Sequence, residues 1–284
     1  MSAAAAGRAS ATNPAPPWGK FAVRTAAWTY LVVLLVIPLL VILQDGLRQG
    51  LDAFLRAVFR PQAFAALWLT VWTAVVMTAI NTVMGTLTAY VLVRYEYPGK
   101  GLLNAIIDLP LAIPSMVTGV MLVILYGPQQ ALGSWLERSL GLRLIFAPPG
   151  IILALLFLTY PFVVRTLQPV LMDLDRAPED AAATLGAGSW TIFRKVTLPA
   201  LALPLVSGSL LSFSRGIGEF GAIVIVAGNI PFYSQTAAVY VLGEVESENR
   251  LGASAISIVM IAAAMGLMLL ATWIQRRAAR TRHP

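Results

Sequence analysis

Long apolar stretches alternate with short polar segments along the whole chain. The apolar stretches cover residues 25–43, 64–93, 103–126, 150–172, 199–228 and 251–274. Each is near or above the roughly 20 residues that a helix needs to cross a bilayer. The stretches are too long for the strands of a membrane barrel and lack the alternation of such strands. The pattern predicts an all-α integral membrane protein with six transmembrane helices.

Composition and charge agree with a membrane protein and suggest its orientation. Hydrophobic residues make up 58% of the chain and charged residues 12%, whereas a soluble domain has about a quarter charged residues. With both termini in the cytoplasm, most lysines and arginines fall on the cytoplasmic side, as the positive-inside tendency requires. The basic residues form no aromatic-interleaved patch, so we expect no nucleic-acid partner. We therefore expect residues 1–23 to be a mobile cytoplasmic tail, residues 24–275 a membrane domain and residues 276–284 a basic cytoplasmic tail.

Prolines interrupt the third apolar stretch close to an acidic residue. Pro110 and Pro114 follow Asp108, so the span is expected to bend rather than run straight. Asp108 could line a pathway through the membrane. It could instead lie at a structural kink near the cytoplasmic interface and pair with a basic residue, and we favour this second interpretation.

Residues 176–199 form a polar segment between the fourth and fifth apolar stretches, and we call them the 176–199 loop. Pro178 suits the first turn of a helix, and Glu179 and Asp180 place carboxylates where a helix N-terminus is electropositive. Gly186 and Gly188 can supply a positive φ, so the first helix should stop near Leu185 and a second should run from Trp190 to Pro199. The loop is predicted to be a helix-turn-helix on the membrane surface. It would act either as a docking element or as an amphipathic connector.

The fifth stretch carries two opposite charges inside an apolar run. Arg215 and Glu219 are four residues apart and so share a helix face. Charges deep in a span must pair, face the bundle interior or line a wet cavity. Gly218 and its neighbouring glycines allow close packing or local unwinding, which suits a gate. Arg215 would either offer a positive site to an anion or form an internal salt bridge that fixes helix packing, and the salt bridge is the simpler reading.

The sequence holds few motifs for bond chemistry. It contains no Gly-x-x-x-x-Gly-Lys-Ser/Thr loop to hold ATP, and its one histidine, His283, lies near the C-terminus. Without cysteine it has no thiol chemistry, and we expect no metal and no cofactor. Gly216 to Glu219 faintly resembles the GxGD signature of intramembrane aspartyl proteases. Such an enzyme requires paired carboxylates, which the segment does not supply.

Several sequence segments resemble known permeases. Asp180-Ala181-Ala182, followed at fixed spacing by Gly186 and by Val196-Thr197-Leu198-Pro199, resembles the EAA loop of ABC-importer permeases, with Asp180 at the position of the usual Glu. The segments YPGKGLLNAIIDLPLAIPS, PFVVRTLQPVL and SFSRGIGEFGAIVIVAGN are similar to the T-type (CysT-like) permeases of sulfate/thiosulfate ABC importers. Asn229-Ile230-Pro231 favours the T-type over the W-type subunit, whereas Gln235 stands where that family has an acidic residue.

The resemblance implies a fold, a function and partners. The implied fold is that of a type I ABC importer permease with a cytoplasmic coupling helix. The chain would form half of a sulfate or thiosulfate pathway across the bacterial inner membrane, with a W-type permease, an ABC ATPase dimer and a periplasmic binding protein as partners. A molybdate or tungstate permease is the alternative within the class. The residues implied in coupling to the ATPase are Glu179, Asp180, Ala181, Ala182, Leu185 and Gly186.

Overall fold

The computed structural model describes residues 17–281, and side chains are described for residues 21–274. The regular secondary structure of this part of the chain is all helical, without a strand. The elements are α1 (Pro17–Leu31), the π-helical segment η1 (Val32–Val36), α2 (Ile37–Leu47), α3 (Leu51–Val58), α4 (Pro61–Arg94), α5 (Lys100–Ala112), α6 (Ser115–Tyr126), α7 (Ala131–Leu140), α8 (Pro148–Asp173), α9 (Ala177–Thr184), α10 (Ser189–Ile192), the π-helical segment η2 (Phe193–Thr197), α11 (Leu198–Ala200), α12 (Ala202–Ile217), α13 (Gly221–Ala227), α14 (Ala237–Glu246) and α15 (Arg250–Thr281). Of the two predicted tails, residues 1–16 and 282–284 lie outside the described part, and α1 already begins at Pro17.

The predicted six spans correspond to four long helices and two bent helix pairs. The long spans are Phe21–Leu47, Pro61–Arg94, Pro148–Asp173 and Arg250–Ile274. The predicted bend in the third span is confirmed, because α5 and α6 meet at 110° around Ile113 and Pro114. Pro114 has no amide hydrogen to continue the helix, and Ile113 is extended there. The all-helical membrane architecture predicted from hydropathy is therefore confirmed.

The fifth apolar stretch, 199–228, does not form one continuous helix. A bend of 73° separates Ser189–Ala200, which includes the end of the 176–199 loop, from Ala202–Ile217. At the other end the helix stops at Ile217, and α13 starts as a separate short helix at Gly221. Apolar residues surround the first break, so hydropathy does not mark it, whereas the second break coincides with Gly218 and Glu219.

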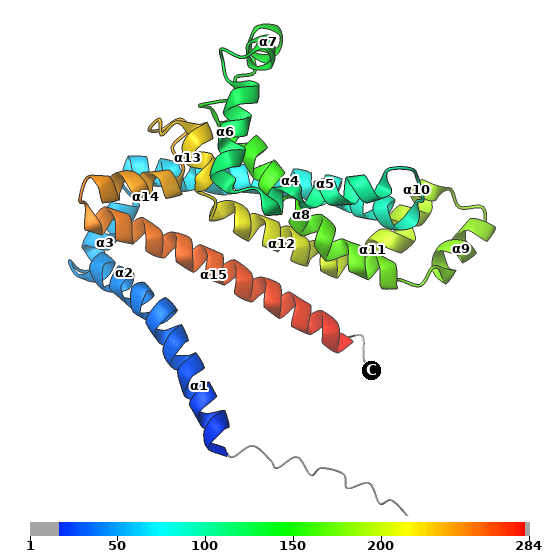
Figure 1. The fold of residues 1–284 in the computed structure, drawn as a ribbon, viewed down its shortest axis with the longest axis horizontal. Helices are drawn as coiled ribbons and strands as arrows, with labels where there is room; N and C mark the ends of the chain where they lie inside the picture. The colour runs from blue at the N-terminus through cyan, green and yellow to red at the C-terminus, as the bar shows by residue number, and fades with distance from the viewer. Residues whose placement is uncertain (1–16, 282–284) are drawn as a thin grey trace, which may run out of the picture.

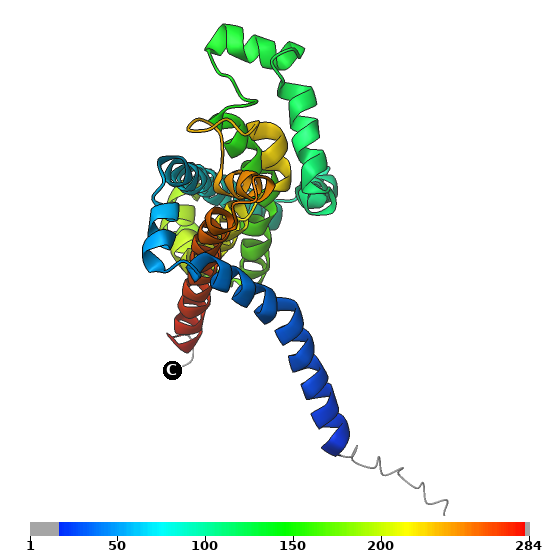
Figure 2. The ribbon, with the colours of Figure 1, turned by 90° about the vertical axis from the view of Figure 1, so that its left-hand side faces the viewer.

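Three spans, α4, α8 and α12, form the centre of the molecule (Figures 1 and 2). A Cβ atom on Gly85 of α4 would lie 2.9 Å from Val163 of α8, so the small residue lets the two helices approach closely. A polar seam crosses the same interface. Asn81 donates to the Thr159 hydroxyl over 2.9 Å, and Ser212 of α12 donates to that hydroxyl over 3.0 Å.

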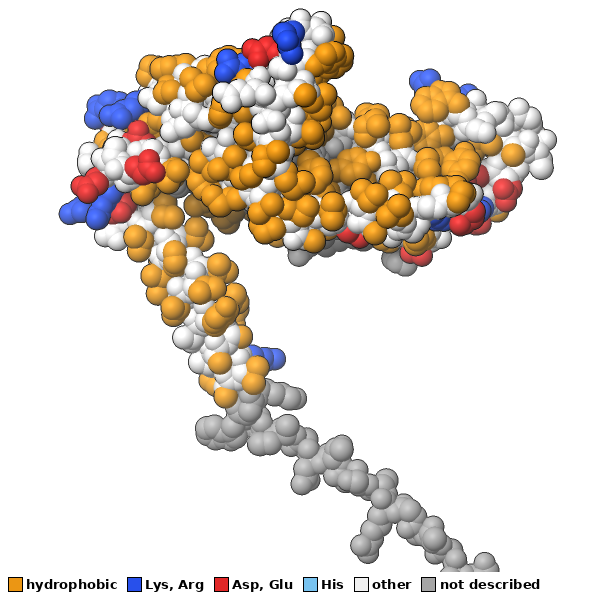
Figure 3. Space-filling view, turned by 45° about the horizontal axis from the view of Figure 1, so that its top comes forward, with side chains coloured by type: hydrophobic (Ala, Val, Ile, Leu, Met, Phe, Trp, Pro, Cys, Tyr) orange, Lys and Arg blue, Asp and Glu red, His pale blue; other side chains and the backbone are white. Residues whose placement is uncertain are grey.

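The first span stands away from this centre. None of its most apolar window is buried within the chain, and Figure 1 shows α1 extending clear of the other helices. Near its C-terminal end, Gly46 packs against Ser254 and Ile258 of α15. The space-filling view shows apolar side chains along the spans and charged side chains gathered toward the ends (Figure 3). That distribution suits a chain whose middle lies in lipid.

Three short helices, α3, α7 and α14, were not predicted from the sequence. They connect spans, and α3 and α14 pack against α15. Each has 8 to 10 residues, too few to appear in a search for membrane-spanning runs.

Candidate functional site

The 176–199 loop folds as the predicted helix-turn-helix. The first helix, α9, ends at Thr184, and Gly186 takes a φ of +81° just beyond it. Ala187 donates its amide hydrogen to the carbonyl of Ala182, and Gly186 donates to Ala183. This pair of bonds is a Schellman motif, which needs a residue that tolerates positive φ where Gly186 stands. The second helical run begins at Ser189, so both predicted helices are confirmed.

Several of the predicted coupling residues lie on the outer surface of this loop. Leu185 is 88% exposed and Trp190 is 67% exposed, although Trp190 stacks on Phe193 at a ring distance of 5.6 Å. Asp180 and Ala181 are exposed, and Ala182 is half-buried. Figure 1 shows the loop at one end of the molecule, beyond the ends of α8 and α12. The surface combines apolar anchors with small side chains that let another backbone approach.

Glu179 lies differently from its neighbour Asp180. Its side chain is 12% exposed, and its Oε1 atom accepts hydrogen bonds from Arg94 Nη2 at 3.0 Å and from Thr197 Oγ1 at 2.7 Å. The two carboxylates at the start of α9 therefore face in different directions. No local pattern signals this difference, because Arg94 precedes Glu179 by 85 residues.

Asp108 pairs with a basic residue, as the favoured interpretation of the sequence predicted. Arg165 of α8 donates to both carboxylate oxygens of Asp108 at 2.6 Å. The same guanidinium reaches Asn104 through the side-chain oxygen at 2.7 Å and the backbone carbonyl at 2.8 Å. Asp108 is thus tied to the neighbouring span, and this contact holds α5 against α8.

Arg215 and Glu219 form the second predicted pair, at the break between α12 and α13. Arg215 Nη1 lies 2.7 Å from Glu219 Oε2, and the other carboxylate oxygen accepts the amide hydrogen of Ala222 at 3.1 Å. The two side chains differ in exposure, with 42% for Arg215 and 2% for Glu219. The guanidinium of Arg215 is therefore partly exposed on the surface of the chain, and its ion-pair partner Glu219 is buried beneath it. Gly218, between them, is exposed and ends α12.

Gln235 lies inside the fold rather than on an outer surface. It accepts from Gln62 of α4 over 2.8 Å and donates to Asn229 over 2.7 Å. An amide can do both at once, whereas a carboxylate could only accept. The replacement of the acidic residue expected from the resemblance thus serves an internal hydrogen-bond chain.

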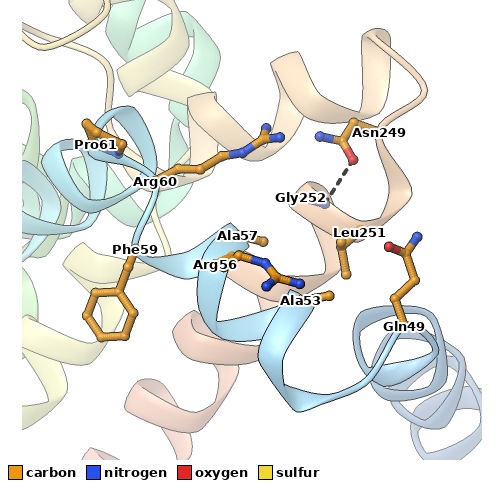
Figure 4. Close-up of a pocket in the computed structure, with 10 residues that line it drawn as sticks. All are labelled: Gln49, Ala53, Arg56, Ala57, Phe59, Arg60, Pro61, Asn249, Leu251 and Gly252. Atoms are coloured by element: carbon orange, nitrogen blue, oxygen red, sulfur yellow. Dashed lines mark hydrogen bonds between the residues drawn. The ribbon is translucent and has the colours of Figure 1, made fainter.

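A cavity of about 510 Å³, not predicted from the sequence, opens beside α3 (Figure 4), and α3 lies at the end of the molecule opposite the 176–199 loop (Figure 1). Arg56 and Arg60 both line it, but Arg60 extends toward α14 while Arg56 lies over α3, where it pairs with Asp52. Next to Arg60, burial and the nearby Glu244 raise the pKa of Tyr240 to about 12. The two guanidinium groups do not converge on one point, so we assign no anion site to this cavity.

Comparisons with known proteins agree with this architecture. Residues 81–282 match the family of binding-protein-dependent transport system inner membrane components. The chain is 41% identical over 246 residues to a probable sulfate transport system permease protein cysT of Nephroselmis olivacea, covering 87% of this chain and 86% of that protein. It is 36% identical to the sulfate transport system permease protein CysT of Escherichia coli (strain K12), covering 88% and 90%. The CysW protein of Synechocystis is 35% identical, covering 91% and 93%.

Solved structures give the same fold. A bacterial ABC transporter that imports the acidic polysaccharide alginate superposes with a TM-score of 0.74 over 92% of this chain and 96% of that one, at 18% sequence identity. Within the described residues, no group of three His, Cys, Asp or Glu side chains could hold a metal ion. The helical membrane fold, the family match and the near full-length similarity to permeases lead to one assignment: the chain belongs to the family of binding-protein-dependent transport system inner membrane components, as a CysT-like permease.

Proposed function

We propose that this chain is one permease subunit of an ATP-driven importer and forms half of the pathway for sulfate or thiosulfate across the bacterial inner membrane. The observation that carries the proposal is the near full-length similarity to CysT proteins, which are named as sulfate transport permeases. Both termini lie in the cytoplasm in this proposal, so the 176–199 loop is on the same side as ATP.

The 176–199 loop is the proposed docking site for the ABC ATPase dimer. An exposed leucine and an exposed tryptophan lie on this loop at the end of the membrane domain, and exposed apolar surface of this kind supports a protein-interaction site. Asp180, Ala181 and Ala182 would contact the ATPase directly, and Gly186 would set the turn that presents Leu185. ATP hydrolysis belongs to that partner, and this chain itself performs no bond chemistry.

The proposed pathway runs past the break between α12 and α13. Leu211, Arg215 and Gly218 are exposed at helical spacing, so they form a strip of α12 that its own chain leaves uncovered. A W-type permease facing this strip would form the other half of the pathway. Arg215 would then offer its guanidinium to a doubly charged oxyanion, with Glu219 limiting how tightly the anion is held.

At the opposite membrane face we propose that a periplasmic sulfate/thiosulfate-binding protein delivers the anion. Support comes from the alginate transporter, whose structure was also solved in complex with a substrate-bound periplasmic protein and has the same fold, with a TM-score of 0.74. An intramembrane enzyme is the alternative from another class. It has little support, because both carboxylate oxygens of Glu219 are already bound, one by Arg215 and the other by the Ala222 amide.

Uptake of radiolabelled sulfate by cells that carry the complete transporter tests the proposal. We expect uptake that requires this chain, with thiosulfate competing and molybdate not competing. Competition by molybdate at low concentration, with thiosulfate inactive, would instead support the molybdate or tungstate permease. Absence of any oxyanion uptake by a correctly assembled complex would overturn the proposed function.

A further inference from the structure

One buried carboxylate oxygen joins three separate parts of the permease. Oε1 of Glu179 accepts from both Arg94 and Thr197, at 3.0 and 2.7 Å. Arg94 is the last residue of α4, Glu179 lies in the first turn of α9, and Thr197 is the last residue of η2. We call these three side chains the Arg94–Glu179–Thr197 clamp. It ties both ends of the 176–199 loop to a span that is remote in sequence.

Burial distinguishes the clamp from ordinary surface ion pairs. The side chains of Arg94 and Glu179 are 7% and 12% exposed, and Thr197 is fully buried. Charge-assisted hydrogen bonds shielded from water are stronger and less screened by salt than exposed ones. Glu96 and Lys100 provide a comparison in the adjacent turn, where Glu96 is 87% exposed and its ion pair contributes little.

Aromatic packing holds the same elements together beside the clamp. The rings of Tyr90 in α4 and Phe193 in η2 meet edge to face at 5.0 Å. Phe193 is buried and also stacks on the exposed Trp190. A continuous line of contacts therefore runs from the outer surface of the loop, through η2, to the end of α4.

We propose that Arg94, Glu179 and Thr197 are positioning residues that pass motion of the 176–199 loop into α4. The loop is covalently continuous with α8 and α12, so a force on it reaches those two spans through the chain itself. The clamp adds α4, which packs along both of them. Coupling energy travels through packed elements of this kind, so the three spans would move as one body. The inference rests on the proposed docking of the ATPase on this loop.

The test uses the complete transporter in proteoliposomes, with both permeases, the ATPase dimer and the binding protein. The readouts are the stimulation of ATP hydrolysis by the binding protein, sulfate taken up per ATP, and co-purification of the ATPase. Glu179→Gln removes the charge but keeps an acceptor, so we expect the ATPase to co-purify normally while the stimulation falls about tenfold. Wild-type stimulation and uptake in this variant would overturn the proposal.

A charge exchange separates positioning from mere structural support. In the double variant Arg94→Glu with Glu179→Arg, the ion pair is kept with reversed polarity, and the Thr197 hydroxyl can accept as readily as it donates. We expect this double variant to recover most of the stimulation that each single variant loses. Failure to recover in an assembled complex would contradict the clamp. Glu96→Gln, in the exposed pair nearby, is the matched control and should behave as wild type.

A second pair of variants applies if the charge variants do not assemble. Thr197→Ser keeps the hydroxyl and should couple as wild type, whereas the isosteric Thr197→Val loses one bond of the clamp and should couple less well. Equal coupling in the two variants would overturn the inference. The proposed docking of the ATPase has a separate test, because Leu185 is outside the clamp. Docking on this loop is refuted if the ATPase co-purifies equally with wild type and with Leu185→Ala.

Discussion

Removing Arg215 should destabilise the protein more than removing its partner Glu219. Arg215→Ala leaves a carboxylate that is 2% exposed and keeps one partner, the Ala222 amide at 3.1 Å. An uncompensated buried charge costs about 3–5 kcal/mol. Glu219→Ala instead leaves a guanidinium that is 42% exposed and can be solvated, so the loss is about 1–2 kcal/mol.

The double variant gives the sharper comparison. Arg215→Ala combined with Glu219→Ala contains no buried charge, so it should be more stable than Arg215→Ala alone. Such a gain on adding a second truncation is the signature of two coupled residues. Arg56→Ala is the control, because Arg56 and Asp52 form an i,i+4 pair with side chains 72% and 80% exposed, worth less than about 1 kcal/mol.

The measurement is the apparent melting temperature of each purified variant in detergent, with unfolding monitored by size-exclusion chromatography. The expected decrease for Arg215→Ala is on the order of 10 °C, from about 2–4 °C per kcal/mol in a chain of this size. If Glu219→Ala melts as low as Arg215→Ala, or the double variant melts lower still, the reasoning from exposure is refuted.

Sulfate uptake by the same variants separates pairing from anion contact. We expect Arg215→Ala to abolish transport and an exchange of the two charges to restore it in part if pairing is their role. Failure of the exchange in a normally assembled protein would assign Arg215 to direct contact with the anion. Wild-type transport by Arg215→Ala would refute both roles.

Three further predictions concern topology, coupling and docking. With both termini in the cytoplasm, an alkaline phosphatase domain fused after Arg282 should be inactive, and strong activity would reverse or break the six-span topology. Gly186→Glu should uncouple ATP hydrolysis from transport while the spans remain inserted, because a φ of +81° is unfavourable for a side-chain-bearing residue and the new charge enters the docking surface. Gly186→Asn, which tolerates that conformation, is its control, and ATPase stimulation by the binding protein is the assay. Leu185→Ala should weaken docking by about 1.5–3 kcal/mol, measured by ATPase co-purification. If both Gly186→Glu and Leu185→Ala give wild-type values, the loop only connects two spans and does not dock the ATPase.

Local patterns predicted much of the fold and of the candidate site. Six apolar runs predicted the spans, and the spacing of Pro178 and Gly186 predicted the two short helices between the fourth and fifth. The pairing of Arg215 and Glu219 could be predicted from the sequence, because residues four apart are neighbours on a helix surface.

Contacts between distant segments could not be predicted in the same way. Arg94 and Glu179 are 85 residues apart, and nothing in the composition near either residue identifies its partner. Asp108 could be expected to find a basic partner, but its identity as Arg165 depends on how α5 packs on α8. The break after Ile217 was suggested by glycines, yet its position depends on Glu219 binding the start of α13.

The polar seam between α4, α8 and α12 also has a consequence for biosynthesis. Asn81 enters the membrane before its partner exists, since Thr159 follows 78 residues later and Ser212 another 53 after that. At about 5–20 residues per second, the ribosome takes on the order of ten seconds to supply both hydroxyls. Until Thr159 is made, the Asn81 amide lacks this hydroxyl partner, in surroundings where an unsatisfied polar group is costly. The Asn81 amide in the nascent second span therefore stays without the Thr159 hydroxyl until the fourth span arrives, and the Ser212–Thr159 bond completes the seam only with the fifth span.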